Sequence, residues 1–510
     1  MIMIKNFKWL LLVSLTFVAC NSDDEVKEAQ ELPITAGSAD FSRYVALGNS
    51  LTSGFSDNAL FIASQENAYP KLMADQFALA GGGEFKTPFM NDNVGGMLLG
   101  GNMIAPPRLI FANGAPTVLP NAVPTTEIGV PLMGPFNNMG VPGAKSFHLL
   151  APGYGDVTGL ANGTANPYFV RFRSSPSTTI IADAMAQNPT FFSLWIGYND
   201  VLGYATTGGD GTNPITPEAL FTQAYNGLIT TLTSNGAKGV VANIPDVSTI
   251  PHFRVVPFNA LDAANPAFGP QIATLNATLA PLNQAFAFLG VPERSIVFNT
   301  TGKSAVVIHD ESLPNISTQL SQVLQAGGVP APTAMLLANQ FGQSRQATDK
   351  DLFVLSSSSV IGTVNTAYYT ALVGQGVPAA TAGQLAVNGI TYPMQDKWVL
   401  LPSEQAEINA ATVLFNGIIK NAADQAGLAF VDANALMTQL SKGGVRFDNF
   451  NMTSDFVKGG AFSLDGIHLT ARANAYVANQ FLAAINATYG STLRMYKPGN
   501  FPISYPAFLQ

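Results

Sequence analysis

The chain has few of the residues that most cofactor and nucleic-acid sites need. It contains one cysteine and four histidines, and no two histidines stand at the spacing of metal ligands, which argues against a metal site built from these residues. Lysine and arginine number 24 against 32 acidic residues, and no basic block follows Lys8. A phosphate backbone needs clustered positive charge, so nucleic acid is excluded as a partner.

Charge of either sign is scarce, and this shortage indicates a folded chain. Only 11% of the 510 residues are charged, whereas 47% are apolar, and disorder requires the opposite balance. Gly 47 and Pro 33 are too many for a coiled coil and follow no collagen period. The length allows about three domains or one elaborated domain with a large core.

The first residues have the pattern of an export signal. Lys5 and Lys8 precede the mostly apolar run 9–19, which would rise about 16 Å as a helix, roughly half of a ~30 Å hydrocarbon core. A basic start, a short apolar centre and a small residue at its end are typical of a secretory signal peptide. Residues 17–20 (FVAC) resemble a bacterial lipobox, whose cysteine becomes lipidated. We therefore expect lipidation of Cys20, the alternative being a signal peptide that contains a buried cysteine.

These features divide the chain into three parts. Residues 1–19 are predicted to be a lipoprotein signal peptide, 20–38 a flexible acidic tether, and 39–510 the globular domain. Residues 22–25 (SDDE) resemble an acidic surface-export tag, although a plain solvated linker is the simpler interpretation of four residues. The expected location is the bacterial outer membrane, held by the lipid anchor, and both the periplasmic and the cell-surface side stay open.

Short apolar runs alternate with helical patterns after the tether. Helical spacing follows Thr216 up to Asn235-Gly236, and again from Ser403 to Gly427. Each of these helices runs directly into an apolar strand, which predicts a parallel sheet covered by helices. The four predicted strands are 43–47, 190–196, 239–244 and 429–431.

Two stretches depart from this alternation. Residues 111–144 carry one charged residue, Glu127, and are broken by proline and glycine, so we expect irregular structure packed over the body. Residues 352–395 have no charged residue and include four consecutive serines, Ser356 to Ser359. This segment is interpreted either as an insertion packed on the domain surface or as an apolar lid near a binding cleft.

Polar residues follow the predicted strands where chemistry is expected. Ser50 comes directly after the first strand and Asn199 after the second, and ligands of open parallel sheets bind beyond the carboxyl ends of strands. Asp465 and His468 stand three residues apart, close enough for the carboxylate to hold the imidazole. A serine hydroxyl is a weak nucleophile without such a base and its orienting group. Taken alone, Ser50 is also explained as a helix cap, and the segments around Asn199 and His468 are also explained as turns.

Taken in order, these segments resemble the four sequence blocks of the SGNH (GDSL-type) serine ester hydrolase family. Residues 48–51 (GNSL) are similar to the first block, 140–143 (GVPG) to the second, 197–200 (GYND) to the third and 465–468 (DGIH) to the last. Asn49 stands where the family usually has aspartate, which removes a charge but no catalytic atom. The long gap between the third and last blocks implies insertions, roughly at 250–400.

The resemblance implies a fold and a site. The fold would be three-layer α/β/α, with a flavodoxin-like, mostly parallel sheet and long insertions. Ser50 would be the nucleophile, His468 the general base and Asp465 its partner. The oxyanion would be held by the N–H groups of Ser50 and Gly143 and by the amide of Asn199. Neither a metal nor an organic cofactor is implied.

The function that follows is hydrolysis of carboxylic esters, of the esterase or lipase type. A polysaccharide O-acetyl esterase is one alternative, so the ester substrate is an acyl lipid or an acetylated glycan. A non-catalytic surface lipoprotein that binds glycans or assembles envelope complexes on a hydrolase fold is another. The other histidines, His148, His252 and His309, are interpreted as structural, since none has a carboxylate placed like Asp465; Asp310, next to His309, should point elsewhere.

Overall fold

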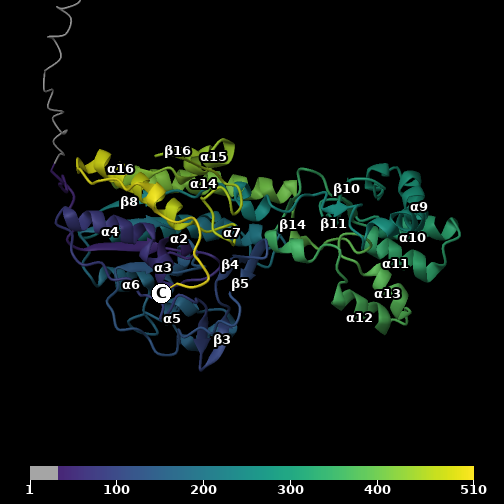
Figure 1. The fold of residues 1–510 in the computed structure, drawn as a ribbon, viewed down its shortest axis with the longest axis horizontal. Helices are drawn as coiled ribbons and strands as arrows, with labels where there is room; N and C mark the ends of the chain where they lie inside the picture. Colours follow the sequence, from purple (N-terminus) through teal and green to yellow (C-terminus); the bar gives the residue numbers. More distant parts are fainter. Residues whose placement is uncertain (1–32, 510) are drawn as a thin grey trace, which may run out of the picture. The chain divides into compact units, whose positions relative to one another are not determined.

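The computed structural model describes residues 33–509, and the chain from Thr35 onward forms one compact unit (Figure 1). The predicted signal peptide, Cys20 and most of the predicted tether lie outside the described residues. Thr35 accepts a hydrogen bond from the backbone N–H of Thr492, and the N–H of Ser38 donates to Tyr489. The compact unit therefore begins before residue 39, where the sequence placed the domain boundary, because residues 35–38 pair with the chain near residue 490.

The chain is an α/β protein with an all-parallel central sheet of five strands. These are β1 (Tyr44–Gly48), β6 (Asn138–Gly140), β7 (Phe191–Trp195), β8 (Lys238–Ala242) and β15 (Ala429–Val431). Their order is β15-β8-β7-β1-β6, a doubly wound arrangement whose direction of winding reverses between β1 and β7. Ligands of such sheets bind in the crevice at that reversal, beyond the strand ends.

Four of these strands are the four that the sequence predicts, within two residues at each end. The fifth, β6, lies inside the stretch 111–144, for which irregular structure was expected, and that expectation is wrong at this point. The strand is three residues long and includes a glycine, so it lacks the apolar run that marks the others. Only its pairing with Ala46, Leu47 and Gly48 of β1 defines it.

Helices cover both faces of the sheet. On one face lie α4 (Tyr69–Leu79) and α16 (Ala471–Tyr489), and on the other α6 (Ile180–Met185), α8 (Glu218–Thr233) and α14 (Pro402–Gln425). Phe191 and Trp195, which share one face of β7, contact aromatic rings of α4 and α16. Phe221 of α8 stacks on Phe415 of α14 at 4.0 Å on the opposite side. Among the described helices, none has the length and apolarity needed to cross a bilayer.

Shorter elements surround the carboxyl ends of the strands. The helices are α2 (Ser50–Ser53), α3 (Ile62–Glu66), α5 (Pro167–Val170), α7 (Tyr198–Thr206) and α15 (Ala433–Lys442). The hairpins are β2 (Met97–Leu99) with β3 (Asn102–Ala105), β4 (Leu109–Ala112) with β5 (Ala115–Val118), and β16 (Val445–Phe447) with β17 (Phe450–Met452). The hairpin β4–β5 also lies in the stretch expected to be irregular.

The segment between β8 and α14 builds a second core of its own. Its buried apolar side chains run from Val256 to Leu401, and in Figure 1 it forms the teal-to-green part away from the central sheet. Its helices are α9 (Ile272–Phe288), α10 (Ser317–Ala326), α11 (Ala331–Phe341), α12 (Thr366–Gly374) and α13 (Ala379–Leu385). Its strand pairs are β9 (Leu261–Asp262) with β10 (Lys303–Ser304), β11 (Val307–His309) with β12 (Ser344–Gln346), and β13 (Leu352–Phe353) with β14 (Val399–Leu400).

The uncharged segment 352–395 is part of this insertion. Phe353, Ile390 and Met394 are buried in the second core, which explains why the segment is apolar. Its helices α12 and α13 lie at the end of the insertion that is far from α2 (Figure 1). The start of the segment, residues 352–359, packs against residues 251–253 of the sheet domain. The segment is therefore part of an insertion, as one of the two interpretations had it, but most of its buried side chains lie in the second core.

Candidate active site

Three adjacent strands deliver the first three sequence blocks to one edge of the sheet. Ser50 begins α2 two residues after β1, and the backbone of β1 pairs with β6 on one side and β7 on the other. Gly143 follows β6 and Asn199 lies in the first turn of α7 after β7. Because the strands are parallel, all three residues leave the sheet at its carboxyl edge, beside the reversal of the strand order.

The fourth block meets Ser50 there. The Nε2 atom of His468 lies 2.8 Å from Ser50 Oγ, and its Nδ1 atom lies 2.8 Å from Asp465 Oδ2. The ring of Phe55 packs against the imidazole at 4.6 Å. Side chains more than four hundred residues apart thus form one continuous chain of hydrogen bonds from a hydroxyl to a carboxylate. This is the arrangement in which an imidazole can remove a serine proton while a carboxylate fixes its orientation.

Asp465 is held as a carboxylate. Burial alone would raise its pKa, but the charge of His468 and a hydrogen bond from its ring oppose that effect. The backbone N–H groups of Ile467 and His468 also donate to Asp465 Oδ1, each at 2.8 Å. Together these contacts keep the pKa of Asp465 well below its usual range. The side chain therefore offers a fixed negative charge to His468.

A turn shortly after the nucleophile braces this carboxylate. The N–H of Asn58 donates to Asp465 Oδ2 at 2.9 Å, and the N–H of Asp57 donates to Ser463 Oγ at 3.0 Å. In the reverse direction, the N–H of Leu464 donates to Asp57 Oδ1 at 3.0 Å. We call residues 56–58 the Asp57 turn. These hydrogen bonds connect the chain just after the first block to the last block. The distance between Ser50 and His468 therefore depends on the backbone as well as on the two side chains.

Asp57 itself is in an unusual state. Burial raises its pKa to about 7, and the nearby charge of Asp465 adds to that effect, while the hydrogen bond from Leu464 opposes it. Its side chain is almost fully buried and is not part of the relay between Ser50 and His468. Asp57 thus changes its charge close to neutral pH, within a turn whose backbone donates to Ser463 and Asp465.

The three donors that the resemblance assigns to an oxyanion lie at the start of α2, after β6 and at the start of α7. The N–H of Ser50 belongs to the first turn of α2, where backbone donors have no partner within the helix. Gly143 is exposed and has φ of +80°, and Asn199 donates from Nδ2 to the carbonyl of Ala144 at 3.0 Å. That bond joins the second and third blocks, and the amide has a second N–H to offer.

Asn49 has a structural part in the first block. It is fully buried, and its Oδ1 accepts the N–H of Leu51 at 3.0 Å, which caps α2. The aspartate usual in the family could accept the same hydrogen bond. Asn49 therefore supplies the cap of α2 without the buried negative charge that an aspartate at this position would add.

His252 is closer to the site than the sequence indicated. Its N–H donates to the carbonyl of Gly466 at 3.0 Å, and its Nδ1 lies 3.3 Å from the carbonyl oxygen of Asp465. Burial lowers its pKa, so it is a neutral imidazole that supports the last block. Gly466 is required there, because its φ is +71° and a Cβ would lie 2.9 Å from the nitrogen of His252.

The remaining histidines are not connected to this site by any hydrogen bond among the described residues. His148 accepts the N–H of Lys145 and stacks on Tyr154 at 4.4 Å, and burial lowers its pKa to about 4. Asp310, beside His309, forms an ion pair with Arg345 at 2.6 Å and so points elsewhere, as expected.

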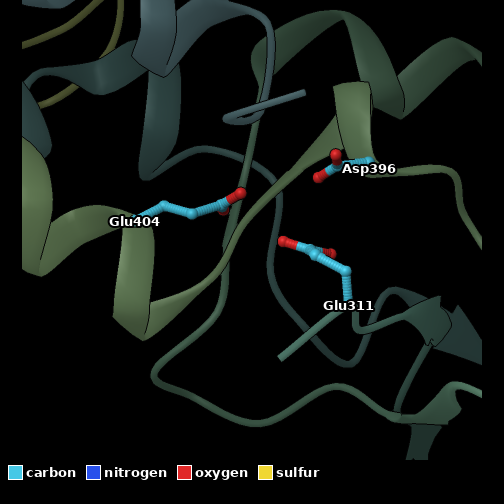
Figure 2. A group of neighbouring side chains, drawn as sticks. All are labelled: Glu311, Asp396 and Glu404. Carbon is cyan, nitrogen blue, oxygen red and sulfur yellow. The ribbon is translucent and has the colours of Figure 1, made fainter. Parts of the chain in front are cut away.

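One other group of acids could hold a cation. Glu311, Asp396 and Glu404 converge so that one oxygen of each lies within 4.8 Å of the others (Figure 2). Burial and the neighbouring acids raise the pKa of Asp396 to about 7 and raise that of Glu404 above its usual range. The raised pKa values favour protonated carboxyl groups at Asp396 and Glu404, which lowers the negative charge of the cluster. The cluster joins the insertion to the first turn of α14.

Comparisons of the chain with protein-family models, with curated proteins and with solved structures each returned no match. The geometry of the site thus carries the functional argument. The motif predicted the residues that meet at Ser50, but it missed the Asp57 turn and His252. Asp57 and Asn58 are turn-forming residues soon after the first block, and this was the one available signal. His252 contacts the backbone of the last block through its own N–H and its ring, and it stands more than two hundred residues away from that block in the sequence, so no local pattern reveals the contact.

Proposed function

We propose that the chain is an SGNH-type serine hydrolase that cleaves carboxylic esters through an acyl-enzyme on Ser50. The observation that carries the proposal is the relay of two 2.8 Å contacts from Ser50 through His468 to Asp465. The strand order, with the second strand in sequence beside the first and the third on its other side, supports the flavodoxin-like form of the fold.

The first half of the reaction forms the acyl-enzyme. Nε2 of His468 removes the proton from Ser50 Oγ as the hydroxyl attacks the ester carbonyl, and Asp465 stabilises the imidazolium. The carbonyl oxygen becomes an oxyanion that accepts hydrogen bonds from the N–H groups of Ser50 and Gly143 and from the amide of Asn199. The imidazolium then gives its proton to the leaving alkoxide.

The second half repeats these steps with water. His468 removes a proton from the water molecule as the oxygen attacks the acyl carbonyl, and the same donors hold the second oxyanion. When the carbon–oxygen bond to Ser50 breaks, His468 returns the proton to Oγ. The carboxylic acid leaves and the enzyme regains its starting state.

Hydrolysis of p-nitrophenyl acetate by the purified mature chain tests this proposal. We expect turnover that Ser50→Ala and His468→Ala each reduce by at least about 10³-fold, since the triad acts as a unit. The exposed Ser441→Ala on α15 serves as a matched serine control and should retain full activity. Equal rates for wild type and Ser50→Ala would refute the proposal.

A polysaccharide O-acetyl esterase is the second candidate, and one feature of the insertion favours it. A cavity of about 430 Å³ there is lined by Asn339, Gln340 and the stacked rings of Tyr368 and Tyr392, whose centres lie 4.2 Å apart. Amides and aromatic faces suit a sugar. Acetate release from acetylated xylan, together with no activity on longer acyl esters, would support this candidate over the first.

We also propose that Cys20 carries the lipid anchor and that the chain is held at the bacterial outer membrane. The proposal is supported by the lipobox-like residues 17–20. Cys20→Ser should move the protein from the membrane fraction to the soluble fraction, and protease treatment of intact cells would separate a periplasmic from a surface orientation.

A further inference from the structure

We propose that the acyl group of the substrate enters an apolar cavity next to Ser50, which makes a short to medium fatty acyl ester the preferred substrate. The inference rests on the proposed function. The cavity has a volume of about 80 Å³ and lies between the carboxyl ends of β7 and β15 and the elements α15, α16 and β16–β17. We call it the acyl cavity.

The cavity is lined by sequence neighbours of the proposed reacting groups, and not by those groups themselves. Leu51, which lines it, follows the nucleophile Ser50, and Ile467, which also lines it, precedes the base His468. Tyr198 brings it next to the oxyanion amide, since that amide is on the following residue. Neighbouring Cα atoms are about 3.8 Å apart, so the wall of the cavity is one residue away from three parts of the proposed site.

The uncharged, mostly apolar side chains that line the cavity favour an apolar ligand. Of the described residues that line the cavity, none is charged, and α15 contributes Leu436, Met437 and Leu440. The hydroxyl groups of a sugar would be buried there without enough hydrogen-bond partners, which is unfavourable, whereas methylene groups gain by leaving water. The cavity therefore fits the acyl part of an ester and not the glycan part.

The volume of the acyl cavity limits the length of the acyl chain that it can hold. An apolar cavity of about 150 Å³ accommodates one benzene molecule, so about half that volume holds roughly three or four carbon atoms beyond the carbonyl. Protein interiors are otherwise close-packed, and an unfilled space lowers stability. A retained apolar space beside a nucleophile is thus explained by a substrate that fills it.

A series of p-nitrophenyl esters, from acetate to dodecanoate, tests the inference on the purified mature chain. Each methylene buried is expected to raise kcat/KM about fourfold, up to an optimum between butyrate and hexanoate, beyond which the value falls. A profile with its maximum at acetate would overturn the inference.

Two variants should move this optimum in opposite directions. Leu440→Ala enlarges the cavity and should shift the optimum to longer acyl chains, while Ala433→Leu fills it and should shift the optimum to shorter ones. A variant that only loosens the fold cannot produce both shifts. Leu324→Ala, the same truncation in the core of the insertion, is the matched control and should keep the wild-type profile. Unchanged optima in both cavity variants would overturn the inference.

The failure of this inference can be told apart from failure of the proposed function. Hydrolysis of the acetate ester that is lost in Ser50→Ala, combined with a profile that does not depend on the acyl cavity, overturns the inference and leaves the hydrolase proposal standing. Absence of any Ser50-dependent hydrolysis overturns both.

Discussion

At the residue scale, the two carboxylate oxygens of Asp465 have different hydrogen-bond partners, and one substitution changes only one of these oxygens. Its Oδ1 accepts the backbone N–H groups of Ile467 and His468, whereas its Oδ2 faces His468 Nδ1. Asn in its place can keep the first set but presents an NH₂ group to the ring, which favours the wrong tautomer. Asp465→Asn should therefore lower kcat by about 10⁴-fold, and it should also lower the melting temperature, because the N–H of Asn58 loses its acceptor. A loss below about tenfold would contradict the assigned role.

Asn199 gives a second prediction at this scale. Its amide is the side-chain donor of the proposed oxyanion hole, and removing one such donor costs about 2.7–4 kcal/mol in the transition state. Asn199→Ala should lower kcat by about 10²–10³-fold with little change in KM. A change confined to KM, measured in the same ester assay, would place the residue in substrate binding instead.

How far the sequence predicts the site depends on which atoms act. Ser50, Asn199, Asp465 and His468 act through side chains, so their identities are visible in four short blocks. The Asp57 turn and His252 hold the last block mainly by contacts with its backbone: Leu464 N–H donates to Asp57, and His252 meets the carbonyl groups of Asp465 and Gly466. Backbone hydrogen bonds leave no residue signature, and this is why the supports of the triad came from the structure.

The Asp57 turn allows a prediction about pH at the scale of elements. Because the pKa of Asp57 is about 7 in the folded chain and 3.8 in model peptides, the folded state binds the extra proton between these values. Its stabilising effect is therefore present at low pH and is lost as the pH rises to about 7. Asp57→Asn can still accept the N–H of Leu464 but never ionises.

We expect Asp57→Asn to gain stability relative to wild type as the pH rises from about 5 to about 8, by roughly 2–4 kcal/mol. Denaturant unfolding at both pH values measures this difference. A gap between the two proteins that is the same at both values would show that Asp57 does not change its ionisation on folding.

The helices and strands were predictable from the sequence where a buried element is long enough to show an apolar run or an apolar period. Strands such as β7, buried on both faces, read as continuous apolar runs, and α8 and α14 show a helical period. β6 has three residues and depends on β1 for its definition, so no local signal could reveal it. The helix pair α12 and α13 was unpredicted for another reason, since residues 352–395 are apolar throughout and show no clear period.

At the scale of the whole molecule, the acidic cluster lies where the insertion meets the sheet domain. Glu311 and Asp396 belong to the insertion, and Glu404 to the first turn of α14. Burial and the other two acids raise the pKa of Glu404 to about 9, so the folded chain keeps this proton where the unfolded chain loses it. The contribution of Glu404 to stability therefore declines as the pH rises from the usual range of glutamate to about 9.

Glu404→Gln should therefore raise the melting temperature at about pH 8 and have less effect near pH 5. Glu218→Gln is a suitable control, because Glu218 also stands in the first turn of a helix but is exposed. Thermal unfolding of the three proteins at both pH values measures the effect. Equal pH dependence in wild type and Glu404→Gln would mean that the cluster carries no shared proton.

The most direct test of the account is covalent labelling of the mature chain with a fluorophosphonate probe, followed by peptide mapping. The account predicts one label per chain, on Ser50, that is lost in Ser50→Ala and strongly slowed in His468→Ala. A wild-type chain that resists the probe, or a label that persists in Ser50→Ala, would contradict the claim that folding creates an activated serine at this site.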